Sequence, residues 1–255
     1  MGLMSGKRGI IFGVANELSI AWGIAQQLKA EGATLAFTYL NEALEKRVRP
    51  LAQSLGSDLV LPCDVASDAD IDAVFQKLGE TWGEIDFVVH AVAFANREDL
   101  KHSFTQTSRD GFHLAMDISA YSLVAMARGA APLMKNGGSI VTMTYLGASR
   151  VIPNYNVMGV AKAALEASVR YLAAELGQKG IRVNAVSAGP IKTLAASGIA
   201  HFREKLKLMD DRAPLHRCTT QEEVGKASMY LLSDLATGVT GEIHFVDSGY
   251  NITGA

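Results

Sequence analysis

The sequence lacks the marks of a secreted, membrane-bound or nucleic-acid-binding protein. Its 255 residues carry a formal net charge of -2 and include only two cysteines. Because no run rich in Lys or Arg accompanies this near-balance of charge, we expect neither nucleic acid nor an anionic membrane as partner. No apolar run approaches the length of a membrane span, and the first residues, MGLMSGKRG, form no signal peptide. We therefore expect a cytoplasmic protein.

Common catalytic and metal-binding motifs are also missing. Cys63 and Cys218 lie far apart and match no metal-ligand spacing, so we expect buried free thiols. The six histidines form no HExxH or comparable cluster, and we expect no metal site. The segment AVSAG has Ala185 where the serine-hydrolase motif G-x-S-x-G begins with glycine. Neither metal chemistry nor serine hydrolysis is therefore indicated.

The chain alternates between short apolar or β-branched runs and longer stretches of helical period. Seven runs are typical of strands: 8–13, 34–39, 57–62, 86–94, 138–145, 181–189 and 241–247. Four of the intervening stretches place apolar residues at helical spacing: 20–29, 42–55, 71–78 and 161–176. This alternation predicts an α/β fold, a Rossmann-type doubly wound seven-stranded parallel sheet with helices on both faces.

No linker or internal repeat divides the chain, so we expect a single domain over residues 1–255. A segment of mixed character, about 193–216, separates the sixth and seventh strands. It has room for one or two short helices. Its position above the carboxyl ends of the strands favours a lid or substrate loop.

The turn after the first strand, FGVANELSIAWG, is a candidate dinucleotide site. Free N–H groups and the helix dipole at the following helix favour a pyrophosphate there. Gly13 is present, but Ser19 and Ile20 stand where a complete glycine fingerprint continues. The alternative is that Gly13 only makes a tight turn and Ser19 only caps the helix. The two interpretations use the same helix end and are compatible.

The next strand ends fit a cofactor lying across them. Asp64 follows the third strand, where its carboxylate can accept from an adenine amino group while Val65 lines the ring; a loop cap is the alternative for Asp64. Small residues after the fourth strand, in HAVAFA, allow close approach of a ligand. After the second strand come Leu40 and Glu42, with no cation before Lys46, which favours NADH over NADPH.

Tyr155 and Lys162 stand seven positions apart in NYNVMGVAK. On a helix their side chains point the same way and are separated by roughly 10 Å along the axis. They are too far apart to bond each other easily, but both can touch one extended ligand. The alternative is an amphipathic tyrosine at a helix start followed by a solvated lysine.

Several segments together resemble the short-chain dehydrogenase/reductase superfamily, and more narrowly its divergent branch, the NADH-dependent enoyl-acyl-carrier-protein reductases. They are SIAWG, CDV, YLGASRVIPNYNVMGVAKAALE and NAVSAGPIKTLAASGI, and the similarity runs nearly end to end. The most specific element is the Tyr-x6-Lys pair with the upstream Tyr145. The commoner carbonyl-reducing branch has Tyr-x3-Lys and an upstream serine, whereas Met158 occupies that tyrosine position here.

The resemblance implies reduction of an enoyl thioester on acyl carrier protein by NADH. Lys162 would hold the nicotinamide ribose, Tyr155 would donate to the thioester oxygen, and Tyr145 would flank the substrate. Residues implied in cofactor binding are Gly13, Ser19, Ile20, Leu40, Asp64, Val65, Val92, Lys162, Ile191, Thr193, Leu194 and Ala195. Residues implied in substrate binding are Ala95, Tyr145, Tyr155, Met158, Pro190, Ala195, Ile199 and Phe202.

The resemblance also implies a homotetramer, with apolar helix faces in 117–134 and 154–176 as interface, although such helices are equally expected in a monomer's core. Three positions depart from the family pattern: Phe12, Leu40 and Ala93. They bear on cofactor geometry and not on the fold. Two alternative functions stay open, a carbonyl or 3-hydroxyacyl reductase of the same superfamily and a non-catalytic dinucleotide-binding regulator.

Overall fold

The computed structural model describes residues 2–191, 193, 206–207 and 210–253. Within this part of the chain, seven parallel strands form one sheet in the order β3-β2-β1-β4-β5-β6-β7. The strands are β1 (Arg8–Phe12), β2 (Thr34–Tyr39), β3 (Val60–Pro62), β4 (Phe87–His90), β5 (Gly138–Thr144), β6 (Ile181–Ala188) and β7 (Ile243–Val246). The predicted doubly wound parallel sheet is confirmed.

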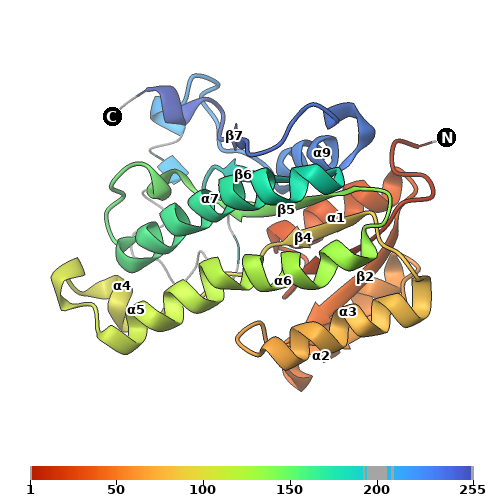
Figure 1. The fold of residues 1–255 in the computed structure, drawn as a ribbon. Helices are drawn as coiled ribbons and strands as arrows, with labels where there is room; N and C mark the ends of the chain where they lie inside the picture. Colours follow the sequence, from red (N-terminus) through yellow and green to blue (C-terminus); the bar gives the residue numbers. More distant parts are fainter. Residues whose placement is uncertain (1, 192, 194–205, 208–209, 254–255) are drawn as a thin grey trace.

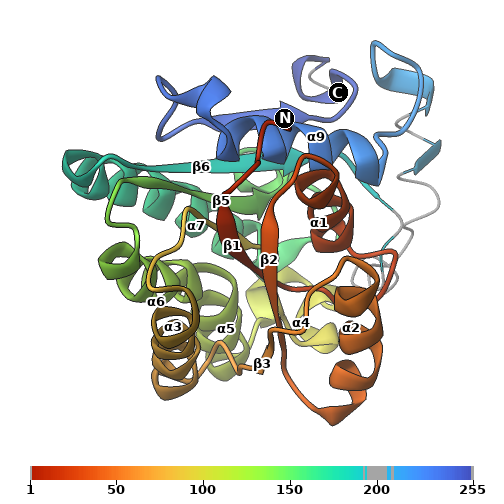
Figure 2. The ribbon, with the colours of Figure 1, turned by 90° about the vertical axis from the view of Figure 1, so that its right-hand side faces the viewer.

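Helices cover both faces of the sheet (Figures 1 and 2). One face packs against α1 (Ile20–Ala30), α2 (Glu42–Ser54) and α9 (Gln221–Leu232). The other packs against α3 (Asp68–Trp82), α6 (Ser122–Ala130) and α7 (Asn156–Leu176). Because both faces are covered, the strands read as continuous apolar runs, as in β1, where Ile10, Ile11 and Phe12 are fully buried.

Shorter elements lie mostly at the ends of these helices and strands. They are α4 (Arg97–Lys101), α5 (Arg109–Met116), a π-helical turn (Asp117–Tyr121) and 3-10 turns at Phe104–Gln106, Ala131–Leu133, Leu146–Ala148, Gly177–Lys179, Asp234–Ala236 and Tyr250–Ile252. The helix α5, the π-helical turn and α6 follow one another without a break. None of the described helices combines the length and the apolarity needed to cross a bilayer.

Several element boundaries differ from the predicted ones. The fourth strand ends at His90 and not at residue 94, because β1 ends at Phe12 and offers no further partner beyond the bond from Ala91 N–H to Phe12 O. Two helices begin earlier than predicted, α3 at Asp68 and not at residue 71, and α7 at Asn156 and not at residue 161. For α3 the reason is a cap, since Ser67 Oγ accepts from Asp70 N–H at 3.2 Å.

Two glycines bring α1 and α9 into close contact. A Cβ atom on Gly225 would lie 2.6 Å from the carbonyl oxygen of Gly23, and one on Gly23 would run into the side chain of Gln221. The backbones of the two helices therefore approach more closely than any residue with a side chain would allow. This contact fixes α9 against the helix that follows the first strand.

We predict that Gly225→Ala destabilises the protein by about 1–3 kcal/mol, because the added methyl group forces the two helices apart. Urea unfolding followed by circular dichroism measures the change. The control is Gly177→Ala, where a Cβ meets nothing within 4 Å and φ is -56°, so alanine fits without strain. Equal stability of Gly225→Ala and wild type would contradict the prediction.

Candidate functional site

The carboxyl ends of the strands bring most of the predicted site residues to one edge of the sheet. Strand order reverses between β1 and β4, and in open parallel sheets the crevice at such a reversal binds the ligand. The predicted residues follow their strands directly: Gly13 after β1, Leu40 after β2, Asp64 after β3, Val92 after β4, Tyr145 after β5 and Pro190 after β6.

Gly13 and Ser19 shape the turn after β1. Gly13 has φ of 103°, and a Cβ there would clash with the carbonyl of Ala91, so the turn requires glycine. Ser19 is buried at the N-cap of α1, but its side chain does not cap the helix. Its Oγ instead accepts from the N–H groups of Ala15 at 3.0 Å and Asn16 at 3.1 Å. The alternative in which Ser19 caps the helix with its side chain is therefore wrong, and Ser19 instead holds the turn together through these two bonds.

The residues expected near an adenosine follow the outer strands β2 and β3. Leu40 is 53% exposed, and Asn41 behind it caps α2 by accepting from Leu44 N–H at 3.1 Å. Asp64 is exposed and closes its own loop by accepting from Ala66 N–H at 3.0 Å, as in the loop-cap alternative. Val65 is half-buried and packs on the core.

A buried serine holds the segment after β4. Ser119 lies in the π-helical turn, donates from Oγ to Phe94 O at 3.0 Å and accepts from Phe94 N–H at 2.9 Å. This pair of bonds fixes the backbone beside Ala95. Sequence reasoning missed Ser119, because a π-helical turn leaves no trace in the apolar spacing.

Tyr145 and Tyr155 meet edge to face. Their ring centroids are 5.0 Å apart with an interplanar angle of 73°. Gly147 makes room for this pair, since a Cβ there would run into the Tyr155 ring. Met158 and Ala95 pack in the same small cluster, so the structure brings four of the predicted substrate residues together.

Both phenols keep their protons at neutral pH. Burial raises the pKa of Tyr145 to about 12, with a smaller contribution from the charges of Tyr250 and Asp247. Tyr155 is buried at the N-terminus of α7, and its burial raises its pKa further. The pair can therefore donate hydrogen bonds to a substrate oxygen.

Lys162 is 6% exposed, so the solvated-lysine alternative is wrong. Its Nζ donates to the carbonyl oxygen of Met143 on β5 at 2.8 Å. Burial lowers the pKa of Lys162 to about 8, and the nearby carboxylate of Glu166 opposes this shift. Of the three N–H donors on Nζ, the described residues engage one, which leaves two for a ligand.

His90 forms a buried polar bridge beside this lysine. Its Nδ1 lies 2.7 Å from Thr142 Oγ1 and its Nε2 lies 2.8 Å from Ser122 Oγ. Ser122 donates its own proton to Ile118 O at 2.7 Å, so it accepts from His90 Nε2–H, and Nδ1 accepts from Thr142. Burial, together with the charge of Lys162, lowers the pKa of His90 to about 3. Sequence reasoning missed this neutral histidine.

The remaining predicted residues lie near the end of β6. Pro190 is buried, Ile191 is half-buried against the core, and Thr193 is half-buried. The residues Leu194, Ala195, Ile199 and Phe202 lie outside the described part of the chain. Of the predicted substrate segment the structure describes short helical pieces at 206–207 and 210–212. Cys63 is buried, but Cys218 is only half-buried.

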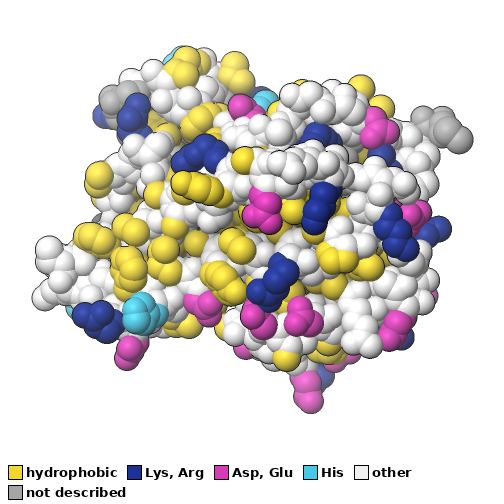
Figure 3. Space-filling model, in the orientation of Figure 1, with side chains coloured by type: hydrophobic (Ala, Val, Ile, Leu, Met, Phe, Trp, Pro, Cys, Tyr) yellow, Lys and Arg dark blue, Asp and Glu magenta, His cyan; other side chains and the backbone are white. Residues whose placement is uncertain are grey.

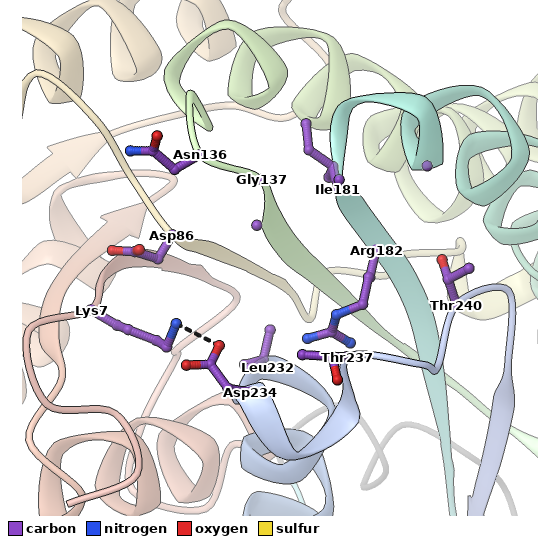
Figure 4. Close-up of a pocket in the computed structure, with 13 residues that line it drawn as sticks. Lys7, Asp86, Asn136, Gly137, Ile181, Arg182, Leu232, Asp234, Thr237 and Thr240 are labelled. Atoms are coloured by element: carbon purple, nitrogen blue, oxygen red, sulfur yellow. Dashed lines mark hydrogen bonds and ion pairs between the residues drawn. The ribbon is translucent and has the colours of Figure 1, made fainter.

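A cavity of about 350 Å³ opens at the opposite edge of the sheet, near the amino ends of β5 and β6 (Figure 4). Its charged groups are partnered within the protein. Lys7 pairs with Asp234 at 2.9 Å, and Arg182 donates to the carbonyl oxygens of Val239 and Ser233. It contains none of the predicted site residues, so the candidate site is the edge with the tyrosines. The described residues contain no cluster suited to a metal ion.

Known proteins resemble this chain over nearly its whole length. A family model described as enoyl-(acyl carrier protein) reductase matches residues 13–251. The enoyl-[acyl-carrier-protein] reductase [NADH] 2 of Rhizobium meliloti is 59% identical over 252 residues, which are 99% of this chain and 94% of that protein.

Two solved structures have the same fold. The Bacillus cereus enoyl-acyl carrier protein reductase, solved with NADP+ and indole naphthyridinone, is 57% identical and matches all of both chains with a TM-score of 0.98. The reductase of Anaplasma phagocytophilum in complex with NAD is 54% identical with a TM-score of 0.97, over 100% of this chain and 97% of that one.

We predict that His90→Gln flattens the acid sensitivity of the protein. The unfolded chain binds a proton at His90 near pH 6.5 and the folded chain only near 3, so wild-type stability falls as the pH decreases through this window. Glutamine keeps a donor and an acceptor but does not titrate. Between pH 7 and pH 5 wild type should lose about 2 kcal/mol more than the variant in urea unfolding. Parallel stability curves would contradict this.

Proposed function

Because the chain belongs to the enoyl-(acyl carrier protein) reductase family, we propose that Tyr145, Tyr155 and Lys162 carry its reaction. The protein is an NADH-dependent enoyl-acyl-carrier-protein reductase of fatty acid biosynthesis. The carbonyl-reducing and non-catalytic alternatives are set aside, since the relatives are named enoyl reductases. One observation carries the proposed roles: the buried Tyr155 lies two helical turns before the buried Lys162, and its ring packs edge to face on the half-buried Tyr145.

The turn after β1 and the free donors of Lys162 fit NADH. Gly13 lets the backbone pass close to Ala91, and the helix that follows directs its first N–H groups to the crevice. Lys162 has two N–H donors to offer the nicotinamide ribose hydroxyls. When bound, NADH supplies the hydride for the enoyl double bond.

Tyr155 acts on the substrate oxygen. As the double bond is reduced, negative charge develops on the thioester oxygen, and a protonated phenol donates to it. This oxygen lies two carbons beyond the one that receives the hydride, further than in a carbonyl reduction. The longer Tyr-x6-Lys spacing sets the phenol further from the lysine and fits this geometry. Tyr145 contacts the Tyr155 ring and flanks the same substrate.

The other ends of the two ligands follow from the strand order. We place the adenosine along Leu40, Asp64, Val65 and Val92, and the pyrophosphate at Ser19 and Ile20. Ala95, Met158 and Pro190 line the acyl chain together with Ile199 and Phe202. The stretch from Ile191 to Ala195 closes over the nicotinamide carboxamide. We propose that residues 1–255 act as one cytoplasmic domain, in which about 193–216 form the substrate segment.

We predict that Tyr155→Phe and Lys162→Met fail in different ways. Tyr155→Phe should lower kcat by about 10²–10³ with NADH affinity within twofold, because the phenol stabilises the enolate. Lys162→Met should raise the Kd for NADH at least tenfold and also slow turnover, because charged hydrogen bonds to the ribose are lost. Fluorescence titration with NADH and a crotonyl thioester assay measure the two effects.

The helix α7 and the 3-10 turn that follows it supply matched controls. Tyr171→Phe changes a tyrosine that is 82% exposed, and Lys179→Met removes an exposed lysine at the helix end, so neither should alter either measurement. Wild-type NADH affinity should fall as the pH rises through about 8, where Lys162 loses its proton, and Lys162→Met should lack this dependence. Normal NADH binding and full activity of Lys162→Met would refute the assigned role.

We further propose that the protein is a homotetramer. In Figure 3 apolar side chains gather over the face that carries α6 and α7 in Figure 1. Val124 on α6 and Ala163 and Ala167 on α7 are only half-buried, and Tyr171 is exposed. The apolar surface that these side chains leave exposed supports 117–134 and 154–176 as the interface of the tetramer.

Light scattering at micromolar concentration should therefore give four times the chain mass of 27.2 kDa. Tyr171→Glu, which places a charge on the outward face of α7, should shift the mass toward smaller species because a buried unpaired charge is costly. The exposed Glu175→Gln on the same helix is the control. A wild-type mass of one chain would rule out the tetramer.

A further inference from the structure

The first residue of α9 is hydrogen-bonded to the turn between β1 and α1. Gln221 Nε2 donates to the carbonyl oxygen of Glu17 at 3.0 Å and also to the carbonyl oxygen of Ser19. The two carbonyls lie more than 200 residues before Gln221 in the chain. A side chain from a distant helix thus holds two peptide groups of the cofactor turn.

The bond to Ser19 reinforces the direction of the next N–H group. Ser19 O also accepts from Trp22 N–H at 2.9 Å and Gly23 N–H at 3.3 Å, so this carbonyl points into α1 and toward α9. The peptide between Ser19 and Ile20 is planar and trans, so the N–H of Ile20 points the opposite way, out of the helix end. That is the direction of an anion at a helix N-terminus.

The bond to Glu17 keeps a second N–H group available. In an α-helix each N–H group donates to the carbonyl four residues earlier. If α1 began one turn earlier, Ala21 N–H would therefore donate to Glu17 O. Gln221 occupies it instead, and α1 begins at Ile20. Within the described chain, the N–H groups of Ile20 and Ala21 have no hydrogen-bond acceptor.

The N-terminus of α9 is itself held rigidly. Thr220 and Glu223 form a reciprocal cap, and Arg217 pairs with Glu223 through two hydrogen bonds of 2.9 and 2.6 Å. The contact between Gly23 and Gly225 sets the distance between the two helices. Gln221 therefore reaches the turn from a fixed base.

We propose that Gln221 is a positioning residue for NADH: it holds the Glu17 and Ser19 carbonyls so that the Ile20 and Ala21 N–H groups face the pyrophosphate. The inference rests on the proposed function, which places the pyrophosphate at this turn. Gln221 itself need not touch the cofactor. It acts through the peptide groups that do.

Two substitutions test this. Gln221→Met keeps the length of the side chain but has no donor, and Gln221→Glu replaces the donor with a carboxylate that repels both carbonyls. Each should raise the Kd for NADH by about five- to tenfold or more, the loss expected for one or two hydrogen bonds. At saturating NADH, kcat should stay within twofold of wild type. Fluorescence titration gives Kd, and an assay with crotonyl thioester gives kcat and KM.

Gln221→Glu also separates binding from folding. An acidic residue in the first turn of a helix interacts favourably with the helix dipole, so this variant should melt no lower than Gln221→Met while binding NADH poorly. The control is Glu223→Gln, which weakens the cap of the same helix but touches no atom of the turn. It should lower the melting temperature and change the Kd for NADH by less than twofold, because the donor of Gln221 is kept.

The outcomes are distinct. NADH affinity within twofold of wild type in both Gln221 variants would overturn the inference, as would an equal loss of affinity in Glu223→Gln, which would indicate general loosening of α9. Wild-type protein that bound no NADH would overturn the proposed function, and this inference with it. Weaker NADH binding confined to the Gln221 variants supports the inference.

Discussion

The hydrogen bond from Lys162 to the carbonyl of Met143 keeps an amine donor at the centre of the site, in surroundings that favour its neutral form. It ties α7 to β5 and so sets the height of Tyr155, two turns earlier on the same helix, above the strand ends. Burying a lysine is costly, and perturbed, buried ionisable groups of this kind cluster at functional sites. The tyrosine pair follows the same strand β5, which is the neighbour of β4 at the strand reversal.

The polar groups of the site differ in whether they change protonation state near neutral pH. Lys162 has a pKa close to neutral pH, whereas the phenols and His90 are held in one protonation state over the same range. Both ring nitrogens of His90 are hydrogen-bonded to hydroxyl groups, so His90 stiffens the junction of β4, β5 and the start of α6 without carrying charge. With His90 neutral, Lys162 has among the described residues the carboxylate of Glu166 but no second cation acting on it, so it keeps its proton more easily.

Much of the fold and part of the site could be predicted from the sequence. Alternating apolar periods reveal the seven strands, and Tyr155 with Lys162 are visible because both lie within one helical stretch. Contacts between distant segments were not visible: Ser119 with Phe94, His90 with Ser122, and Gln221 with Glu17 each join separate elements. Ser19 was predicted as a site residue, but its bonds to Ala15 and Asn16 were not, since these partners lie upstream in an irregular turn that no periodicity describes.

The π-helical turn between α5 and α6 makes the length of the chain critical at one place. A π-helical turn bonds each residue to one five positions away, so it holds one residue more than an α-helical turn. The loss of a residue would let α5 and α6 merge into one regular helix with Leu123 and Met126 still in the core, but a residue lost between Ser119 and Ser122 would change their spacing, so that they could no longer both reach their partners. Over evolution, insertions and deletions should therefore be tolerated in exposed stretches such as 102–107 but be excluded from this turn.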